Sequence, residues 1–99
     1  MIDKDPTITN LLSALDLSER GRQIVDHWGA DTCAVGIART SEPRRLVYVS
    51  TFSNAPGRYD YECEVPSGPE DSDFETVERG ESVTYDRLLD ALARHLGNL

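Results

Sequence analysis

The spacing of apolar residues changes twice along the 99-residue chain, and this change of period constrains the fold more than any other feature. Apolar residues recur at helical intervals from Thr7 to Gly29, alternate from Asp31 onward, and return to helical intervals after Thr84. Residues on one face of a helix repeat about every 3.6 positions, whereas those on one face of a strand repeat at every second position. The sequence therefore predicts helices at both ends of the chain and strands between them.

A phase slip at Asp16 and Leu17 divides the N-terminal helical pattern into two parts. The apolar residues before and after the slip form separate stripes: Ile8, Leu11, Leu12 and Leu15, and then Leu17, Ile24, Val25 and Trp28. Ser18 is placed to accept a backbone N–H at the start of a new helix, and Gly29 is placed to end it in the left-handed conformation. The sequence therefore predicts two short N-terminal helices, the second between Ser18 and Gly29.

The middle of the chain has the pattern of antiparallel strands. Cys33 to Ala38 carries apolar or very small residues on both faces, which is typical of a strand buried on both sides. Leu46 to Phe52 is rich in β-branched and aromatic residues, which pack well on a sheet. Pro56 and Gly57 suit the central positions of a type II turn that leads into a third strand from Tyr59 to Val65. These connections are too short for parallel crossovers, so we expect antiparallel pairing.

The end of the chain completes an α+β pattern. Phe74 to Arg79 is a candidate for a short fourth strand, and Thr84 is placed to cap a C-terminal helix that Gly97 ends. Four leucines form the apolar stripe of this helix: Leu88, Leu89, Leu92 and Leu96. The order of elements predicts one α+β domain over residues 1–99, with two short N-terminal helices, a three- or four-stranded antiparallel meander sheet, and a C-terminal helix packed on the sheet.

The negative charge of the chain is confined to one segment. The formal net charge is −8, and residues 60–81 hold nine acidic side chains against Arg79 alone, while both flanking parts are neutral. An acidic excess disfavours contact with nucleic-acid phosphates and with anionic membranes, and it speeds association with a basic protein. We therefore expect a basic protein partner and no direct binding to nucleic acid or membrane. Five arginines elsewhere are candidates for a separate basic patch: Arg20, Arg22, Arg39, Arg44 and Arg45.

The candidate partner-binding residues are carboxylates of the third strand and the segment after it: Asp60, Glu62, Glu64, Glu70, Asp71, Asp73 and Glu75. Strand alternation places Asp60, Glu62 and Glu64 on one face, with about 7 Å between successive residues. The leading hypothesis is a non-enzymatic adaptor, or an immunity-like inhibitor of a basic toxin or nuclease by analogy alone. The alternative interpretation is a solvated face whose charge keeps the domain soluble and discourages edge pairing.

Two other functions compete with protein binding through the acidic segment. One is a small-molecule-binding protein or enzyme with a pocket between the sheet and the helices, in which Tyr48, Tyr61, Cys63 or a histidine meet. The other is a homodimer through the face of Val47 and Val49, since the second strand is apolar on both faces and its extra face requires cover.

The sequence contains no motif for metal, cofactor or catalysis. Cys33 and Cys63 match neither a zinc spacing nor a CxxC pair, so we expect two reduced, buried cysteines. His27 and His95 fall near predicted helix ends, where the dipole favours them and where they cap the helix or face solvent. The segment 71–75 begins like a calcium loop but lacks the turn glycine and the final bidentate glutamate.

The N-terminus has no basic stretch followed by an apolar run, and nowhere does the chain approach the ~18 apolar residues of a spanning helix. We therefore expect a soluble cytoplasmic protein without metal, cofactor or enzymatic activity.

Overall fold

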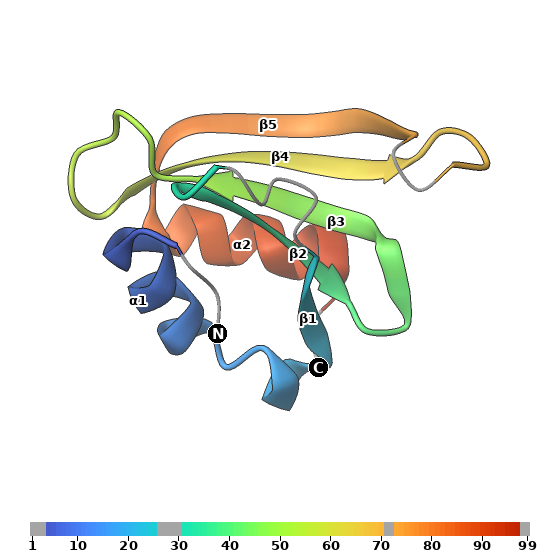
Figure 1. Cartoon of the computed structure of the whole chain (residues 1–99), viewed down its shortest axis with the longest axis horizontal. Coiled ribbons are helices and arrows are strands. Elements are labelled where there is room, and N and C mark those ends of the chain that lie inside the picture. Colours follow the sequence, from blue (N-terminus) through green and yellow to red (C-terminus); the bar gives the residue numbers. More distant parts are fainter. Residues whose placement is uncertain (1–3, 26–30, 71–72, 98–99) are drawn as a thin grey trace.

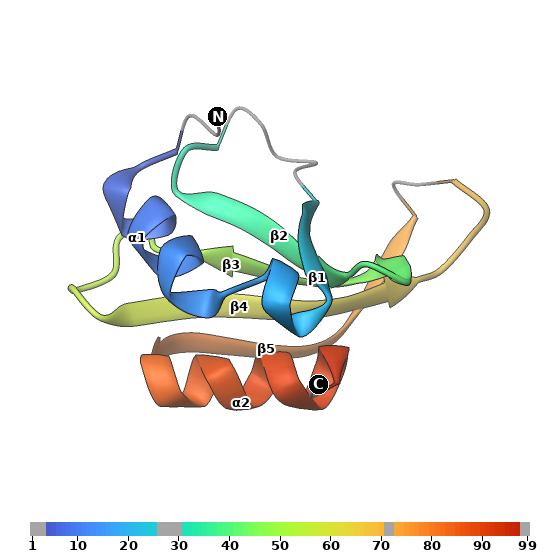
Figure 2. The same ribbon diagram turned by 90° about the horizontal axis from the view of Figure 1, so that it is seen from below.

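The computed structural model describes residues 4–25, 31–70 and 73–97. Within these residues, five antiparallel strands form one sheet in which each strand pairs with the next along the chain. The strands are β1 (Arg22–Val25), β2 (Ala34–Arg39), β3 (Glu42–Ser50), β4 (Arg58–Pro66) and β5 (Phe74–Thr84). Two α-helices lie on the same face of the sheet (Figures 1 and 2), and a single 3-10 turn follows the first: α1 (Pro6–Leu15), α2 (Tyr85–Leu96) and η1 (Ser18–Arg20). The predicted α+β class and antiparallel meander are confirmed.

The second N-terminal helix predicted between Ser18 and Gly29 is wrong. After η1, Gly21 adopts a φ of 67°, and the chain continues as the edge strand β1, which pairs with β2 along its whole length. Ile24 and Val25 are β-branched, which lowers their helix propensity and suits a pleated sheet. Pairing with β2 also satisfies backbone groups of this segment. The predicted end of the helix, with Trp28, lies outside the described residues.

The sheet has five strands rather than three or four. One addition is β1, and the other is the predicted fourth strand, which forms and continues beyond Arg79 to Thr84. This extension follows from the register with β4, which pairs Arg58 with Thr84 at one end and Pro66 with Phe74 at the other. The acidic segment therefore lies along the whole length of the β4–β5 hairpin.

The signals at the Pro56–Gly57 turn and at Thr84 hold as predicted, whereas Ser18 makes no side-chain cap. Arg58 N donates to Ala55 O at 3.1 Å, and Gly57 between them adopts a φ of 78°. The Thr84 hydroxyl accepts from Arg87 N at the start of α2. At α1, the Asp5 carboxylate accepts from Thr7 N, so this helix begins slightly before the predicted pattern.

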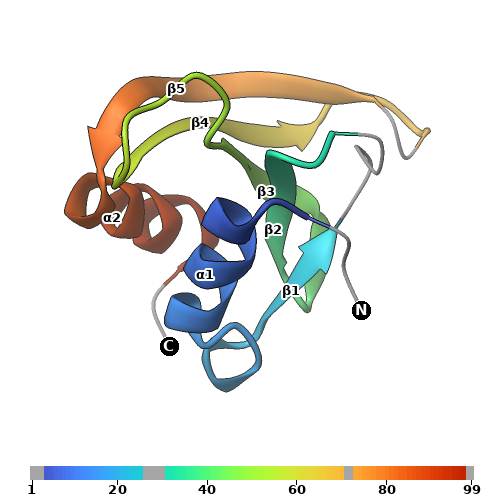
Figure 3. The same ribbon diagram turned by 60° about the vertical axis from the view of Figure 1, so that its left-hand side comes forward.

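The core lies between the two helices and the concave face of the curved sheet (Figure 3). Its buried side chains come from every layer: Ile8, Leu11 and Leu15 of α1, Val35, Ile37, Val47, Val49, Tyr61 and Cys63 of the sheet, and Leu88, Ala91, Leu92 and Leu96 of α2. Full burial of one such aliphatic side chain is worth roughly 1.5–3 kcal/mol. Val47 and Val49 have no exposed surface, so a homodimer contact would need another face of the molecule.

The second face of the central strands is also partly buried within the chain. Ala34, Ala38 and Leu46 have no exposed surface although they alternate with the core residues of β2 and β3. The predicted burial of β2 on both sides is confirmed. Of the two free cysteines, Cys63 is buried as expected, whereas Cys33 is half-buried.

Candidate functional site

The sheet face turned away from the helices carries the predicted carboxylates of β4. Val47 and Val49 face the core. Tyr48 and Ser50 alternate with them and therefore face the other way, as do their β4 partners Glu62 and Asp60. We call this side of the sheet the outer face. It holds no helix of the described residues (Figure 1).

The three carboxylates of β4 do not form the evenly exposed row that alternation predicts. Asp60 and Glu62 are partly exposed, but Glu64 is only 9% exposed. Glu64 pairs with the fully buried Leu46, and the pairing of β4 with β5 shifts register between Cys63 and Glu64. The expectation of a solvated Glu64 is therefore wrong, although its unbroken register with β3 keeps it on the same face as Glu62.

Asp60 and Glu62 line a hollow of about 210 Å³ on the outer face. The lining residues define what we call the acidic hollow: Tyr48, Ser50, Asp60, Tyr61, Glu62, Arg79, Gly80 and Glu81. It combines three carboxylates with one guanidinium and the ring of Tyr48, and it lies on the opposite side of the sheet from the pocket between sheet and helices that the small-molecule hypothesis expects. Glu81 and Gly80 were missed, because only the full length of β5 and its register place Gly80 opposite Tyr61, with Glu81 next to it.

The side chains around the acidic hollow are held in place by neighbours. The Asp60 carboxylate accepts from Ser82 N at 2.8 Å, which fixes β5 where its pairing with β4 is irregular. The Tyr48 hydroxyl donates to the Asp31 carboxylate at 3.3 Å. Burial, together with the negative charges of Asp31 and Glu62, raises the pKa of Tyr48, so this phenol stays protonated. The hollow thus keeps a neutral aromatic ring beside negative charge.

The remaining predicted residues lie at the other end of the hairpin, a group we call the far-end acids: Glu70, Asp73 and Glu75. Arg44 of β3 donates its Nη2 to the carbonyl oxygens of Gly68 and Asp73, at 2.6 and 3.3 Å, and also to that of Glu70. The Asp73 carboxylate accepts from Glu70 N at 3.1 Å. These contacts fold the loop itself. Asp71 lies outside the described residues.

Glu78 has a structural role on the helix side of the hairpin. Its carboxylate accepts from Tyr61 Oη and from Arg94 Nη1 of α2, each at 2.6 Å. These two hydrogen bonds lower the pKa of Glu78, and the same contacts raise the pKa of Arg94. Arg94 also donates to Asp90 at 3.0 Å. The network ties β4 and β5 to α2.

Three of the five arginines proposed as a basic patch instead bind backbone carbonyls. Arg22 Nη2 donates to Gly97 O at 3.0 Å and Arg45 Nε donates to His95 O at 2.8 Å, so both satisfy carbonyl groups at the C-terminal end of α2. Arg44 binds the β4–β5 loop as described above. Arg22 is only 6% exposed, and burial together with Arg20 lowers its pKa.

Cys63 and His95, a potential nucleophile and a potential base, are both buried. Burial and the nearby Glu78 raise the pKa of Cys63 to about 11, which keeps the thiol protonated. His95 is buried, and its Nε2 donates to Glu64 O at 2.9 Å; burial lowers its pKa. The neutral ring therefore ties α2 to β4 instead of facing solvent. His27 lies outside the described residues.

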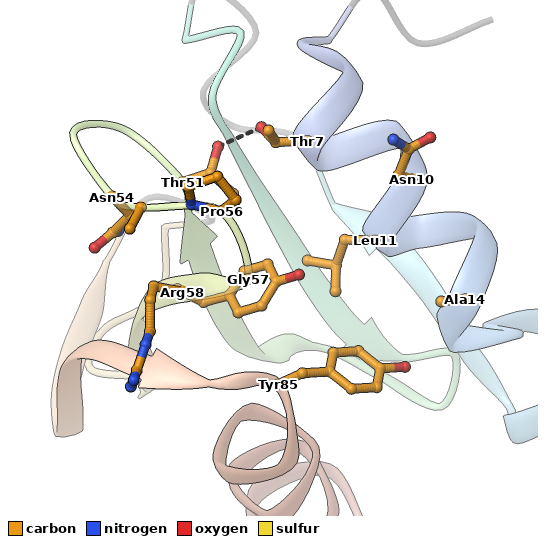
Figure 4. A pocket seen from close by; sticks show the side chains of 12 residues that line it. Thr7, Asn10, Leu11, Ala14, Thr51, Asn54, Pro56, Gly57, Arg58 and Tyr85 are labelled. Atoms are coloured by element: carbon orange, nitrogen blue, oxygen red, sulfur yellow. Dashed lines mark hydrogen bonds between the residues drawn. The ribbon is translucent and has the colours of Figure 1, made fainter.

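A second cavity, of about 310 Å³, lies between α1, the β3–β4 loop and the start of α2 (Figure 4). We call it the α1 cavity; its lining is Thr7, Asn10, Leu11, Ala14, Thr51, Asn54, Ala55, Pro56, Gly57, Arg58, Tyr59 and Tyr85. The rings of Tyr59 and Tyr85 lie 6.4 Å apart at 55°. This is a pocket between sheet and helix, and Tyr59 lines it, but Tyr48, Tyr61, Cys63 and His95 do not.

Within the described residues, no three His, Cys, Asp or Glu side chains gather as metal ligands do, and no helix is long and apolar enough to cross a membrane. Comparisons with protein-family models, with curated proteins and with solved structures found no significant match. The comparisons therefore assign neither an activity nor a partner to this chain.

Proposed function

We propose that this chain is a non-enzymatic protein-binding module whose acidic hollow receives a basic side chain of its partner. The observation that supports this most is the convergence of Asp60, Glu62 and Glu81 around Tyr48, on the sheet face that the helices leave open. A guanidinium or ammonium group entering the hollow meets carboxylates and an aromatic ring together. Both attract cations, and the attraction strengthens as water leaves the site.

Among the described residues that line the hollow, Arg79 is the one cation, and it is weakly held. Arg79 Nη2 lies 4.0 Å from Glu62 Oε1, and the Arg79 side chain is 66% exposed. Exposed pairs of this kind contribute about 0–1 kcal/mol, so a partner's arginine can displace Arg79 at little cost. The wider segment of residues 60–81 adds a long-range negative field that accelerates the approach of a basic surface.

The role within this class is that of an adaptor or of an inhibitor that covers a basic site on another protein. Both cysteines are free, which fits the reducing conditions of the cytoplasm. The residues expected to contact the partner are Tyr48, Asp60, Glu62 and Glu81. The far-end acids contribute to the field but not to the contact.

The test compares two variants that remove the same charge. The hollow variant carries Asp60→Asn, Glu62→Gln and Glu81→Gln, and the control carries Glu70→Gln, Asp73→Asn and Glu75→Gln. Both keep side-chain oxygens as acceptors, including the one that binds Ser82 N. Each protein is immobilised and exposed to lysate of the source organism at low and moderate salt, and the bound proteins are identified by mass spectrometry.

We expect one basic protein to be retained by the wild type and the control and lost from the hollow variant. Equal retention by all three would refute binding at the hollow. Retention of nothing by the wild type at low salt would favour the solvated-face interpretation. Circular dichroism melts verify that both variants fold.

A further inference from the structure

A third cavity, of about 290 Å³, lies between the two helices and the 3-10 turn that follows α1. We call it the interhelix cavity; its lining is Ala14, Leu15, Arg20, Arg22, Tyr85, Leu89, Asp90 and Ala93. The end of α1, the turn η1 and the helix α2 all lie on the side of the sheet opposite the outer face (Figures 1 and 3). The interhelix cavity shares no residue with the acidic hollow, so the two sites can be tested separately.

Arg20 and Arg22 bring two positive charges to this cavity, and no carboxylate of the described residues neutralises them. Neither arginine forms an ion pair within the described part of the chain. Burial of Arg22 and repulsion by the charge of Arg20 lower the pKa of Arg22. Asp90 also lines the cavity, but its carboxylate accepts from Arg94 Nε at 3.0 Å. The cavity is therefore a positive site in a chain whose formal net charge is −8.

The two arginines differ in what they offer a ligand. Arg22 is only 6% exposed, its Nη2 donates to Gly97 O at 3.0 Å, and its Nε is enclosed without a partner among the described residues. Arg22 is therefore fixed in place, and it acts on a ligand through its charge rather than through Nε. Arg20 is exposed, and its side chain makes no hydrogen bond to another described residue. Its planar guanidinium can therefore bind a carboxylate with two parallel hydrogen bonds.

The remaining lining is largely apolar and partly open to solvent. Leu89 belongs to the leucine stripe predicted for the C-terminal helix, yet it is 36% exposed, whereas Leu88 and Leu92 have no exposed surface. Leu89 lines the interhelix cavity together with Ala14 of α1 and Ala93 of α2. An exposed leucine in the same cavity as two arginines offers a ligand both apolar contact and a counter-charge. An inorganic anion would use only the charged part of this lining.

We propose that the interhelix cavity binds a small organic monocarboxylate with an apolar body. The carboxylate accepts two hydrogen bonds from the Arg20 guanidinium, and the charge of Arg22 adds to the attraction. The apolar body packs against Leu89, Ala14 and Ala93. The volume of about 290 Å³ is close to the lower limit of roughly 300 Å³ for ligand sites, which suits a molecule with a single ring.

The test separates charge from apolar contact with three probes: benzoate, benzamide and acetate. Benzamide keeps the ring of benzoate without its charge, and acetate keeps the charge without the ring. Each probe is titrated into the whole ¹⁵N-labelled chain at neutral pH and constant ionic strength, while backbone amide signals are followed by NMR. We expect benzoate to shift the signals of Arg20, Gly21 and Leu89 and to bind about five-fold more tightly than either other probe. Equal binding of benzamide or acetate, or no shift at these residues, would overturn the proposal.

The same chemistry occurs in free acids and at the carboxyl end of a peptide. A fourth probe, N-acetyl-leucine, copies a peptide end and separates these two sources. Tighter binding of N-acetyl-leucine than of benzoate would assign the cavity to a peptide end, and weaker binding would assign it to a free acid. Both results support a carboxylate site, because both probes carry the same charge on an apolar body.

Two variants locate the site. Arg20→Gln removes the exposed guanidinium and should weaken benzoate binding about five- to ten-fold, because charge-assisted hydrogen bonds are the stronger ones. Leu89→Ser removes apolar surface from the cavity and should reduce the affinity for benzoate to that for acetate. Circular dichroism melts verify that both variants fold. Wild-type affinity of folded Arg20→Gln for benzoate would contradict the assignment.

Arg87→Gln is the matched control, since it removes the same charge from an exposed position of α2 outside the cavity. It should bind benzoate as the wild type does. Equal weakening by Arg20→Gln and Arg87→Gln would show a diffuse effect of charge and overturn the site. The hollow variant of the previous section should bind benzoate no less tightly than the wild type, so failure of either proposal leaves the other intact.

Discussion

The two ends of the β4–β5 hairpin carry similar charge and use it differently. At the far end, Asp73 binds the backbone of its own loop, and Arg44 binds three carbonyls there. At the other end, Asp60 also binds backbone, yet Glu62 and Glu81 remain around an open hollow beside Tyr48. Net charge alone does not distinguish these ends. The contacts of each carboxylate do: those at the far end hold the loop, and the other end is the one for which we propose a recognition role.

The boundary between the two ends is the bulge at Glu64. On one side of it the carboxylates of β4 are partly exposed, and at Glu64 itself the side chain is buried and the backbone carbonyl accepts from His95. The helix α2 therefore holds β4 at the point where the acidic face ends. A change at either end should leave the other end intact.

Arg44→Met should give the largest effect and confine it to the far end. The substitution removes the charged donor to the carbonyls of Gly68, Glu70 and Asp73, and hydrogen bonds to charged groups are worth about 1.5–3 kcal/mol each. Because one nitrogen serves all three, we expect a loss of about 2–3 kcal/mol in the free energy of unfolding, measured by urea denaturation. Hydrogen exchange should accelerate at Ser67 and Asp73 but not at Tyr48. Faster hydrogen exchange at both ends of the hairpin would contradict separate roles for the two ends.

Gly80→Ala should give a smaller effect, at the hollow end of the hairpin and in the part of the core that the Tyr61 ring occupies. A Cβ atom at this position would lie 2.3 Å from Cε2 of the Tyr61 ring, so the ring must move. Overpacking of this kind costs about 1–3 kcal/mol, and we expect about 1–2 kcal/mol in urea denaturation. Loss of partner binding with unchanged exchange at the far end would support the separate roles. Wild-type stability would mean that Tyr61 is not held against Gly80.

The pH dependence at the boundary should be the smallest effect. The pKa of His95 is lowered by burial, so the unfolded chain, with a pKa near 6.5, binds a proton before the folded chain does. The contribution of His95 to stability should therefore be constant above about pH 7 and fall as the pH drops through about 6.5 toward the folded pKa.

His95→Gln keeps a donor for Glu64 O and cannot titrate, which makes it the matched variant for this prediction. Its stability should vary less than that of the wild type between about pH 7.5 and pH 5.5, as measured by urea denaturation. The carboxylates with lowered pKa values, Asp5 and Glu78, titrate below this window. Equal slopes for both proteins would contradict the role given to His95.

The fold was predictable wherever local signals decide it. The Thr84 cap, the turn at Pro56 and Gly57 and the alternation along β2 each depend on neighbouring residues, and each forms as expected. The segment of Ile24 and Val25 was not predictable in this way. Its apolar spacing fits a helix and a strand equally, and the choice is made by pairing with β2, which lies across an intervening stretch of chain.

Only part of the candidate site was predictable from the sequence, again because pairing between distant strands decides the rest. Asp60, Glu62 and Tyr48 could be named from strand alternation, but Glu81 and Gly80 join them only through the register of β4 with β5. No local pattern predicts the burial of Glu64, which shares a face with the partly exposed Glu62. The folding role of Asp73 depends on Arg44, which lies 29 positions away along the chain.

The central claim is that the acidic hollow, and not acidity as such, binds the partner. The most direct measurement is the dissociation constant of the captured basic protein for the wild type, the hollow variant and the far-end control, at low and moderate salt. We predict at least a ten-fold weaker complex for the hollow variant and a change of no more than about two-fold for the control, because contact within the hollow outweighs the screened field. Equal weakening in both variants, removed equally by salt, would contradict the account and leave only a diffuse acidic surface.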